Sequence, residues 1–151
     1  MRALILTHEA APSQQCYRLF AEQGTQIIAQ TNLARRTTPR NSVFGFDKEY
    51  TVHGGGIEVR LKYFGMARTD SDTVVYFPAQ KVVAVGELLG DETPTVDSAH
   101  GGELAGWRSA LAEVLKFDFD VVVPAHGKLA TRADLESFKA KLDALAHAGA
   151  P

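Results

Sequence analysis

The sequence has almost no cysteine and no long hydrophobic run, and each absence excludes a class of protein. Cys16 is the single cysteine of the 151 residues, so the chain cannot form an internal disulfide and does not depend on an oxidising compartment. The apolar run near the N-terminus covers only the four residues 3–6, which is too short for the core of a signal peptide or for a spanning helix. We therefore expect a cytoplasmic protein without a membrane partner.

The chain also lacks a large excess of positive or negative charge. The formal net charge is -2, and the basic residues gather only in a short segment with Arg35, Arg36 and Arg40. Because a nucleic-acid surface needs a larger basic footprint, we do not expect nucleic acid as a partner. Hydrophobic residues make up 45% of the chain and charged residues 23%, which is typical of a globular protein, and the length predicts a single domain over residues 1–151.

The hydrophobic pattern of the first third predicts an α/β order. The apolar residues 3–6 indicate a buried strand, and apolar residues at helical spacing follow Pro12 and Ser13 until Gly24 ends the helix. Residues 26–29 indicate a second strand, which implies a parallel pair joined by a right-handed crossover. The polar residues 32–42 indicate a surface loop or a short frayed helix.

The remainder predicts hairpins first and helices later. Two hairpins are expected, one from residues 50–52 and 57–61 around a glycine turn and one from residues 73–77 and 81–85. Apolar residues at helical spacing predict a helix over 103–116, and a short apolar strand follows at 121–123. Thr131 with Asp134 resembles a capping box at the start of the last helix.

Four short segments occur in an ordered set. They are Thr7-His8 after the first strand, the segment 65–73 (GMARTDSDT), the segment 85–89 (VGELL) and the segment 123–127 (VPAHG). Their order and intervals resemble the metallo-β-lactamase superfamily over nearly the whole chain. The resemblance implies an α/β fold, a partial αββα sandwich in which sheets pack against helices and which comprises mainly the C-terminal half of the family domain.

The resemblance also implies that most family metal ligands are replaced. In the family motif H-x-H-x-D-H only the first histidine is retained, as His8, while the later ligand positions are Ala10, Pro12 and Ser13. Alanine and proline have no side-chain donor atom, and a serine hydroxyl is a poor zinc ligand. The histidine of the family pattern G-x-A-H-T-D-G-D is Arg68, a permanent cation without a lone pair to donate.

Three candidate donors remain. Glu87 matches the family's bridging aspartate, and His126 matches the last histidine, so His8, Glu87 and His126 are the candidate metal ligands. Two imidazoles and a carboxylate are chemically enough for one zinc or iron ion. In the family, His8 and His126 match ligands of different metal subsites, which leaves open whether they can share one ion.

Two functions follow from this reduced set. In the first, a single zinc ion held by His8, Glu87 and His126 activates a water that attacks an ester, thioester or lactam. In the second, the chain has no cofactor and no catalysis, and a pocket lined by Arg68 and Glu87 serves a small-molecule ligand or a partner. There the guanidinium either pairs with Glu87 to fill the vacated space or binds a carboxylate or phosphate.

Two further expectations concern the loop and the assembly. Asp70 and Asp72 are expected to shape the loop of the segment 65–73 rather than to bind a ligand. The family strands that precede the first ligand loop are absent from this sequence, which should expose a strand edge and an apolar sheet face. We therefore predict a homodimer in which a second copy covers that surface.

Overall fold

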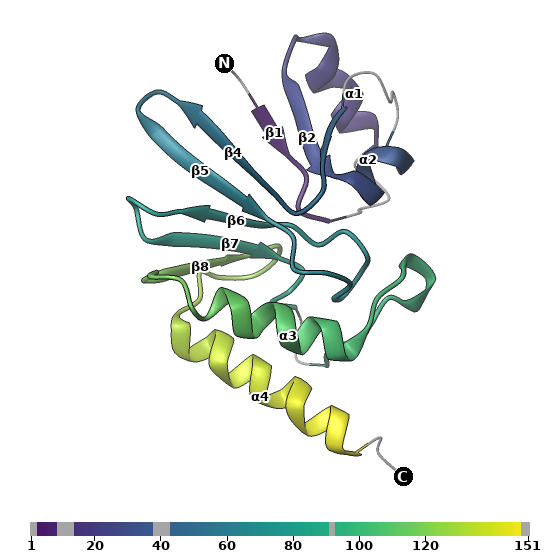
Figure 1. Ribbon diagram of the computed structural model, residues 1–151, viewed down its shortest axis with the longest axis vertical. Coiled ribbons are helices and arrows are strands. Elements are labelled where there is room, and N and C mark those ends of the chain that lie inside the picture. The colour runs from purple at the N-terminus through teal and green to yellow at the C-terminus, as the bar shows by residue number, and fades with distance from the viewer. Residues whose placement is uncertain (1–2, 9–13, 38–42, 91–92, 149–151) are drawn as a thin grey trace.

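The described residues form four layers in the order helices, sheet, sheet, helices (Figure 1). The computed structural model describes residues 3–8, 14–37, 43–90 and 93–148. Helices α1 (Gln14–Glu22) and α2 (Thr31–Arg36) cover a three-stranded sheet, and helices α3 (Leu104–Val114) and α4 (Arg132–Ala148) cover a five-stranded sheet. The mixed α/β sandwich predicted from the sequence is confirmed.

The first sheet is parallel throughout. It contains β1 (Ala3–Ile5), β2 (Gln26–Gln30) and β3 (Val43–Phe46) in that order. The predicted crossover between the first two strands is thus confirmed, with α1 as its helix. Of the two alternatives for residues 32–42, a surface loop or a short helix, the structure shows a helix, α2, which begins at Thr31; residues 38–42 lie outside the described residues. Strand β3 was not predicted.

The second sheet is mostly antiparallel. It contains β4 (Glu49–Gly54), β5 (Ile57–Lys62), β6 (Val74–Phe77), β7 (Val82–Gly86) and β8 (Val121–Pro124) in sequence order. Both predicted hairpins are present, and only β8 runs parallel to its neighbour β7. The parallel pair requires a crossover, and α3 supplies it.

The two faces of the second sheet bury different side chains. On the outer face Val74, Val83 and Val122 are fully buried against α3 and α4, where the Trp107 indole donates to the carbonyl of Leu88 at 3.0 Å. The inner face packs on the first sheet through a separate buried cluster: Ile28, Phe46, Leu61 and Val75. The core therefore lies on both sides of the second sheet.

Helix α4 begins as the sequence predicts. The backbone N–H of Thr131 donates to Asp134 Oδ2 at 2.8 Å, and the backbone N–H of Asp134 donates to Thr131 Oγ1 at 3.3 Å, which is the reciprocal pattern of a capping box. In the part of the chain that the structure describes, no helix has both the length and the apolar content needed to cross a membrane.

Candidate functional site

Three strands of the two sheets end side by side, and the loops that follow them carry the candidate donors. The backbone N–H of Thr73 donates to the carbonyl of Thr7 at 2.7 Å, which joins the end of β1 to the start of β6. The backbone N–H of Ala125 donates to the carbonyl of Gly86 at 3.0 Å, which joins the ends of β7 and β8. The residues that follow β1, β7 and β8 are thereby brought to one place, as is usual for sites in α/β folds.

Glu87 lies at the centre of the resulting cluster. Its Oε1 is 3.0 Å from His126 Nε2 and 3.7 Å from His8 Nε2, and its Oε2 is 3.4 Å from Arg68 Nε. The four side chains named from the sequence are therefore together. The structure brings His8 and His126 to the same carboxylate oxygen, although the family assigns the matching ligands to different subsites.

The burial of these side chains decreases outward from Glu87. The side chains of Glu87 and His8 are only 14% and 18% exposed, Arg68 is 29% exposed, and His126 is 78% exposed. A carboxylate with this little access to water is costly unless it is paired. The guanidinium of Arg68 and the imidazoles of His8 and His126 therefore replace water around the Glu87 carboxylate.

Gly86 allows the loops to approach this closely. Its φ of +56° is in the left-handed region, and a Cβ placed there would lie 2.9 Å from Thr7 Oγ1 and 3.6 Å from His8 Nδ1. Any larger residue would push the His8 loop away from Glu87. The glycine before the carboxylate is thus required by packing as well as by backbone conformation.

The surroundings of His8 disfavour its protonated form. Burial lowers the pKa of its imidazole, and Arg68 and His126 lower it further, while the charge of Glu87 opposes them. On the other side of the ring, His8 Nδ1 lies 2.9 Å from the hydroxyl of Thr7. If that hydroxyl donates to Nδ1, the ring proton is on Nε2 and faces Glu87.

The loop that carries Arg68 is fixed by the segment before α3. The backbone N–H of Asp97 donates to the carbonyl of Arg68 at 2.9 Å, and a Cβ on Gly102 would lie only 2.1 Å from that same oxygen. Both contacts fix the carbonyl of Arg68, from which a long side chain extends. Among the described residues, the ion pair with Glu87 is the only hydrogen bond or ion pair of the Arg68 guanidinium.

Asp72 is the most unusual group beside the cluster. It is 4% exposed, and its Oδ2 accepts from the backbone N–H of Thr69 at 2.6 Å, but its Oδ1 has no partner among the described residues. Burial raises the pKa of Asp72 to about 6, although the bonds from Thr69 and the charge of Arg68 lower it. Sequence reasoning gave no sign of this unpartnered oxygen, because it depends on burial.

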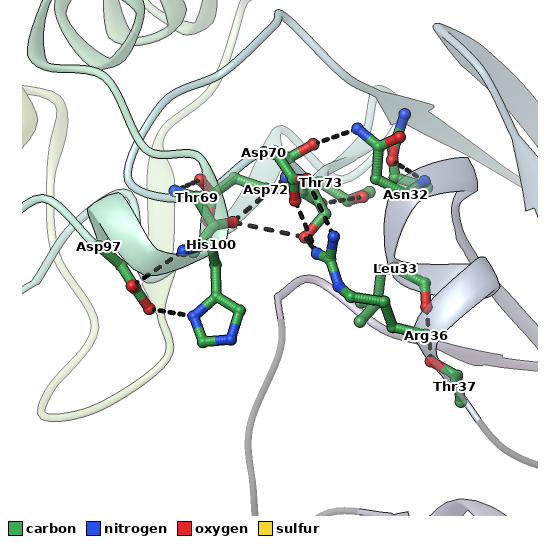
Figure 2. A network of polar contacts seen from close by, with 12 residues as sticks. Asn32, Leu33, Arg36, Thr37, Thr69, Asp70, Asp72, Thr73, Asp97 and His100 are labelled. Carbon is green, nitrogen blue, oxygen red and sulfur yellow. Dashed lines mark hydrogen bonds and ion pairs between the residues drawn. The ribbon is translucent and has the colours of Figure 1, made fainter.

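Asp70 ties the same loop to α2, as Figure 2 shows. The two terminal nitrogens of Arg36 donate to the two carboxylate oxygens of Asp70, at 2.9 and 2.6 Å. Asn32 Nδ2 donates to the Asp70 backbone carbonyl at 2.8 Å. The expected loop-shaping roles of Asp70 and Asp72 are confirmed by these bonds. Arg36 was missed, since its basic surroundings in the sequence resemble an ordinary surface segment.

The described side chains do not fit a metal centre. Across residues 3–8, 14–37, 43–90 and 93–148, no group of three or more His, Cys, Asp or Glu side chains is arranged to hold a metal ion. A cation that cannot give up its charge also sits 3.4 Å from the one carboxylate of the set. The replaced ligand positions Ala10, Pro12 and Ser13 lie outside the described residues. The assignment of His8, Glu87 and His126 as metal ligands stays a prediction.

Solved structures share this fold at low sequence identity. A metallo-β-lactamase from Pontibacter korlensis is 22% identical with a TM-score of 0.78, and the alignment covers 95% of this chain and 69% of that one. The mono-zinc form of the metallo-β-lactamase FIM-1 from Pseudomonas aeruginosa is 22% identical with a TM-score of 0.74 and coverages of 97% and 67%. The peroxy diiron species of the chemotaxis sensor ODP is 10% identical with a TM-score of 0.74 and coverages of 94% and 70%.

The chain spans about two thirds of the length of these structural relatives. No curated protein matches the sequence. The family model described as the metallo-β-lactamase superfamily matches residues 2–126, which is most of the chain and contains every residue of the Glu87 cluster. By that match, and by the sandwich that carries it, this protein belongs to the metallo-β-lactamase superfamily.

Proposed function

We propose that this protein is a metal-free, non-catalytic member of its superfamily that binds a small polar ligand at the cluster of Arg68, Glu87, His8 and His126. The observation that carries the proposal is the ion pair between Arg68 Nε and Glu87 Oε2 at 3.4 Å. It places a fixed positive charge on the carboxylate that a metal would need. The cation of the site is then a side chain and not an ion.

The surroundings of Arg68 support a binding role over simple filling of space. A guanidinium has five N–H donors, and a pair made only to fill a cavity would satisfy most of them within the protein. Here one long contact to Glu87 is the only such contact that the described residues make. Asp97 and Gly102 fix the backbone from which these donors extend, and the ion pair with Glu87 orients the guanidinium, which supports a binding role.

The competing function is hydrolysis with a single zinc ion. The convergence of His8 and His126 on Glu87 Oε1 favours it, because the two imidazoles are within 3.7 Å of one oxygen. Arg68 opposes it, because a divalent cation at the same carboxylate would meet the guanidinium charge. The two functions therefore differ first of all in metal content.

Metal analysis decides between them. The full-length protein, purified without chelator, should contain far less than one metal ion per chain, and added zinc should leave its melting temperature unchanged. His126→Ala and His147→Ala are compared with the parent protein, since the second removes an exposed histidine in α4 that lies outside the cluster. About one zinc per chain, with a thermal shift lost in His126→Ala but kept in His147→Ala, would establish the hydrolase instead.

Binding itself is measured by NMR. The Nε–H signal of Arg68 and the backbone amide of Glu87 report directly on the cluster, and small carboxylates, amines and amino acids are added one at a time at millimolar concentration. At least one of these solutes should shift both signals in a saturable way. If none does, and zinc is bound, the proposed binding role fails.

A further inference from the structure

The cluster and its neighbours carry more negative than positive charge, and this limits the ligand. We propose that the site takes a zwitterion whose ammonium and carboxylate lie on one carbon, as in an α-amino acid, with Arg68 holding the carboxylate and Glu87 the ammonium. This inference rests on the proposed binding function and names its ligand class. The inference is argued from the charges around the guanidinium of Arg68.

In the part of the chain that the structure describes, Arg68 is the one Lys or Arg side chain that pairs with Glu87, whereas three carboxylates interact with Arg68. Glu87 is the ion-pair partner of Arg68 at 3.4 Å. The charge of Arg68 also opposes the burial that raises the pKa of Asp72, and it contributes to the lowered pKa of Asp97. Asp97 has a partner of its own, since His100 Nδ1 lies 2.7 Å from its Oδ2. Glu87 and the buried Asp72 thus both interact with the charge of Arg68. A simple anion would add a third negative charge to these two.

The guanidinium nevertheless has donors to offer. Its Nε side is turned to Glu87, and the described residues take no hydrogen bond from its two terminal nitrogens. A guanidinium that pairs through one edge can still bind a carboxylate through two parallel N–H donors on another edge. The carboxylate of a ligand can therefore bind without displacing Glu87.

Glu87 and His126 provide the matching place for a positive group. His126 Nε2 lies 3.0 Å from Glu87 Oε1, so a neutral ring that donates this bond carries its lone pair on Nδ1. That ring is 78% exposed, which leaves Nδ1 accessible from solvent. An ammonium group has three N–H donors and no acceptor, and it can donate both to the carboxylate and to the imidazole.

The spacing of the protein charges suits opposite charges on one carbon. Arg68 Nε and Glu87 Oε2 are 3.4 Å apart, so the site presents a cation and an anion as immediate neighbours. An α-amino acid presents the same two charges in the opposite sense, and antiparallel alignment of the two pairs places each charge beside its opposite. A ligand with only one charge leaves one partner of the pair unsatisfied, and this is how such a site discriminates.

Three probes of similar size test the inference. L-alanine carries both charges, propionate only the carboxylate and ethylamine only the ammonium. Each is titrated into the full-length protein at pH 8, and the Arg68 and Glu87 NMR signals are followed. L-alanine should bind at least about tenfold more tightly than either other probe, a ratio that corresponds to roughly 1.4 kcal/mol.

Variants of the two charged residues sharpen the test. Arg68→Gln should abolish the response to L-alanine, and Arg68→Lys should weaken it, since lysine keeps the charge but not the planar pair of donors. Glu87→Gln should reverse the preference, so that propionate binds more tightly than L-alanine. Lys116→Gln and Glu113→Gln remove the charges of an exposed ion pair at the C-terminal end of α3 and should leave all three affinities unchanged. Circular dichroism confirms that each variant folds.

The outcomes separate this inference from the function on which it rests. Equal or tighter binding of propionate to the parent protein would overturn the zwitterion while keeping a metal-free binding site. Binding of ethylamine alone would overturn it in the same way. Absence of binding by all three probes contradicts the ligand class, and bound zinc contradicts the proposed function itself.

Discussion

Among the described residues, the two ends of the sandwich have buried clusters of very different size. The outer face of the second sheet and helices α3 and α4 share a large cluster of fully buried side chains that includes Trp107, Leu111 and Leu142. Between the first sheet and helices α1 and α2, the buried cluster contains only five described residues: Leu6, Tyr17, Ile27, Ala29 and Leu33. We therefore expect the end with α3 and α4 to contribute more of the stability of the fold.

The Glu87 cluster lies where the two ends meet. Glu87 and His126 follow strands of the well-packed second sheet, whereas His8 follows β1 of the first sheet. The geometry of the site therefore depends on the smaller end staying docked. Opening of the first sheet would remove His8 from Glu87 while the rest of the site persists.

Strands β7 and β8 also differ in burial between their two faces. On their outer face Val83 and Val122 are 0% exposed, but on the inner face the paired residues Val82, Ala84, Val121 and Val123 are all partly exposed. The first sheet has three strands and the second has five, and the end of β1 lies against the start of β6 and the end of β7. The described part of the first sheet therefore leaves the inner side of β8 incompletely covered.

The largest effect that this comparison predicts is self-association. We expect a second copy to cover the inner face of β7 and β8, because partly exposed aliphatic pairs side by side favour burial. A micromolar dimer corresponds to about 8 kcal/mol of association free energy. Light scattering should give the mass of a dimer. A clean monomer at micromolar concentration would contradict the expectation.

Point variants locate the dimer surface. Val121→Lys places a charge on the inner face and should return the protein to a monomer with its fold intact. Thr51→Lys adds the same charge at an exposed position of β4 and should leave the dimer unchanged. A dimer that survives Val121→Lys would show that association uses another surface.

A second test compares the two cores directly. Leu111→Ala in the large core should cost about 3–5 kcal/mol, because tightly packed neighbours cannot close the cavity. Leu33→Ala in the small core removes the same atoms from a residue that is also buried, at 2% exposure, and should cost less, about 2 kcal/mol. The free energies of unfolding are measured with urea.

Hydrogen exchange shows where each substitution acts. Leu33→Ala should accelerate exchange in β1 and β2 and leave β6 and β7 protected, whereas Leu111→Ala should accelerate exchange throughout. Equal costs and equal exchange patterns would mean that the two ends unfold as one unit and that the contrast in core size has no energetic meaning.

Local patterns in the sequence predict most of this architecture. Helical spacing marked α1, α3 and α4, alternation and glycine turns marked both hairpins, and Thr131 with Asp134 marked the start of α4. Strand β3 was missed because Gly45 and its polar approach weaken the strand signal. The αββα arrangement itself came from the family resemblance, since the order of layers depends on contacts between distant residues.

The site was predictable in its residues but not in its geometry. Family spacing named His8, Arg68, Glu87 and His126, and the structure places all four together. The contact of His8, Arg68 and His126 with the carboxylate of Glu87 could not be foreseen, because it depends on where three strands end. Long-range pairs such as Arg36 with Asp70 leave no periodic signal, so no pattern in the sequence could have indicated them.

A third test uses the buried carboxyl of Asp72. Its pKa in the folded protein is about 6, above the ordinary 3.8, so the folded state binds this proton more tightly than the unfolded state does. The associated stability is present below pH 4 and is lost as pH rises through about 6. Asp72→Asn should remove this loss and stabilise the protein at pH 8 by on the order of 2 kcal/mol.

The measurement is urea unfolding at pH 4.5 and at pH 8 for the parent and the variant. In Asp72→Asn the amide oxygen can still accept the bond from the Thr69 N–H, so the loop keeps its shape. Asp120→Asn, at an exposed position before β8, provides the matched control and should behave as the parent does. Equal pH dependence of parent and Asp72→Asn would show that this carboxyl ionises as it does in water.

The smallest effect is expected at the polar connection between the two ends. Arg36→Lys keeps the charge beside Asp70 but replaces two parallel hydrogen bonds by at most one, which should cost about 1 kcal/mol. Arg35→Lys at the exposed neighbouring position should cost nothing measurable. Because Asp70 N–H donates to the carbonyl of His100 at 2.8 Å, its exchange rate reports on the loop itself. Faster exchange at Asp70 in Arg36→Lys, with α3 and α4 unchanged, would show that α2 holds the Arg68 loop in place. Unchanged exchange would assign that task to Gly102 and Asp97 alone, and the site would then belong entirely to the larger end of the molecule.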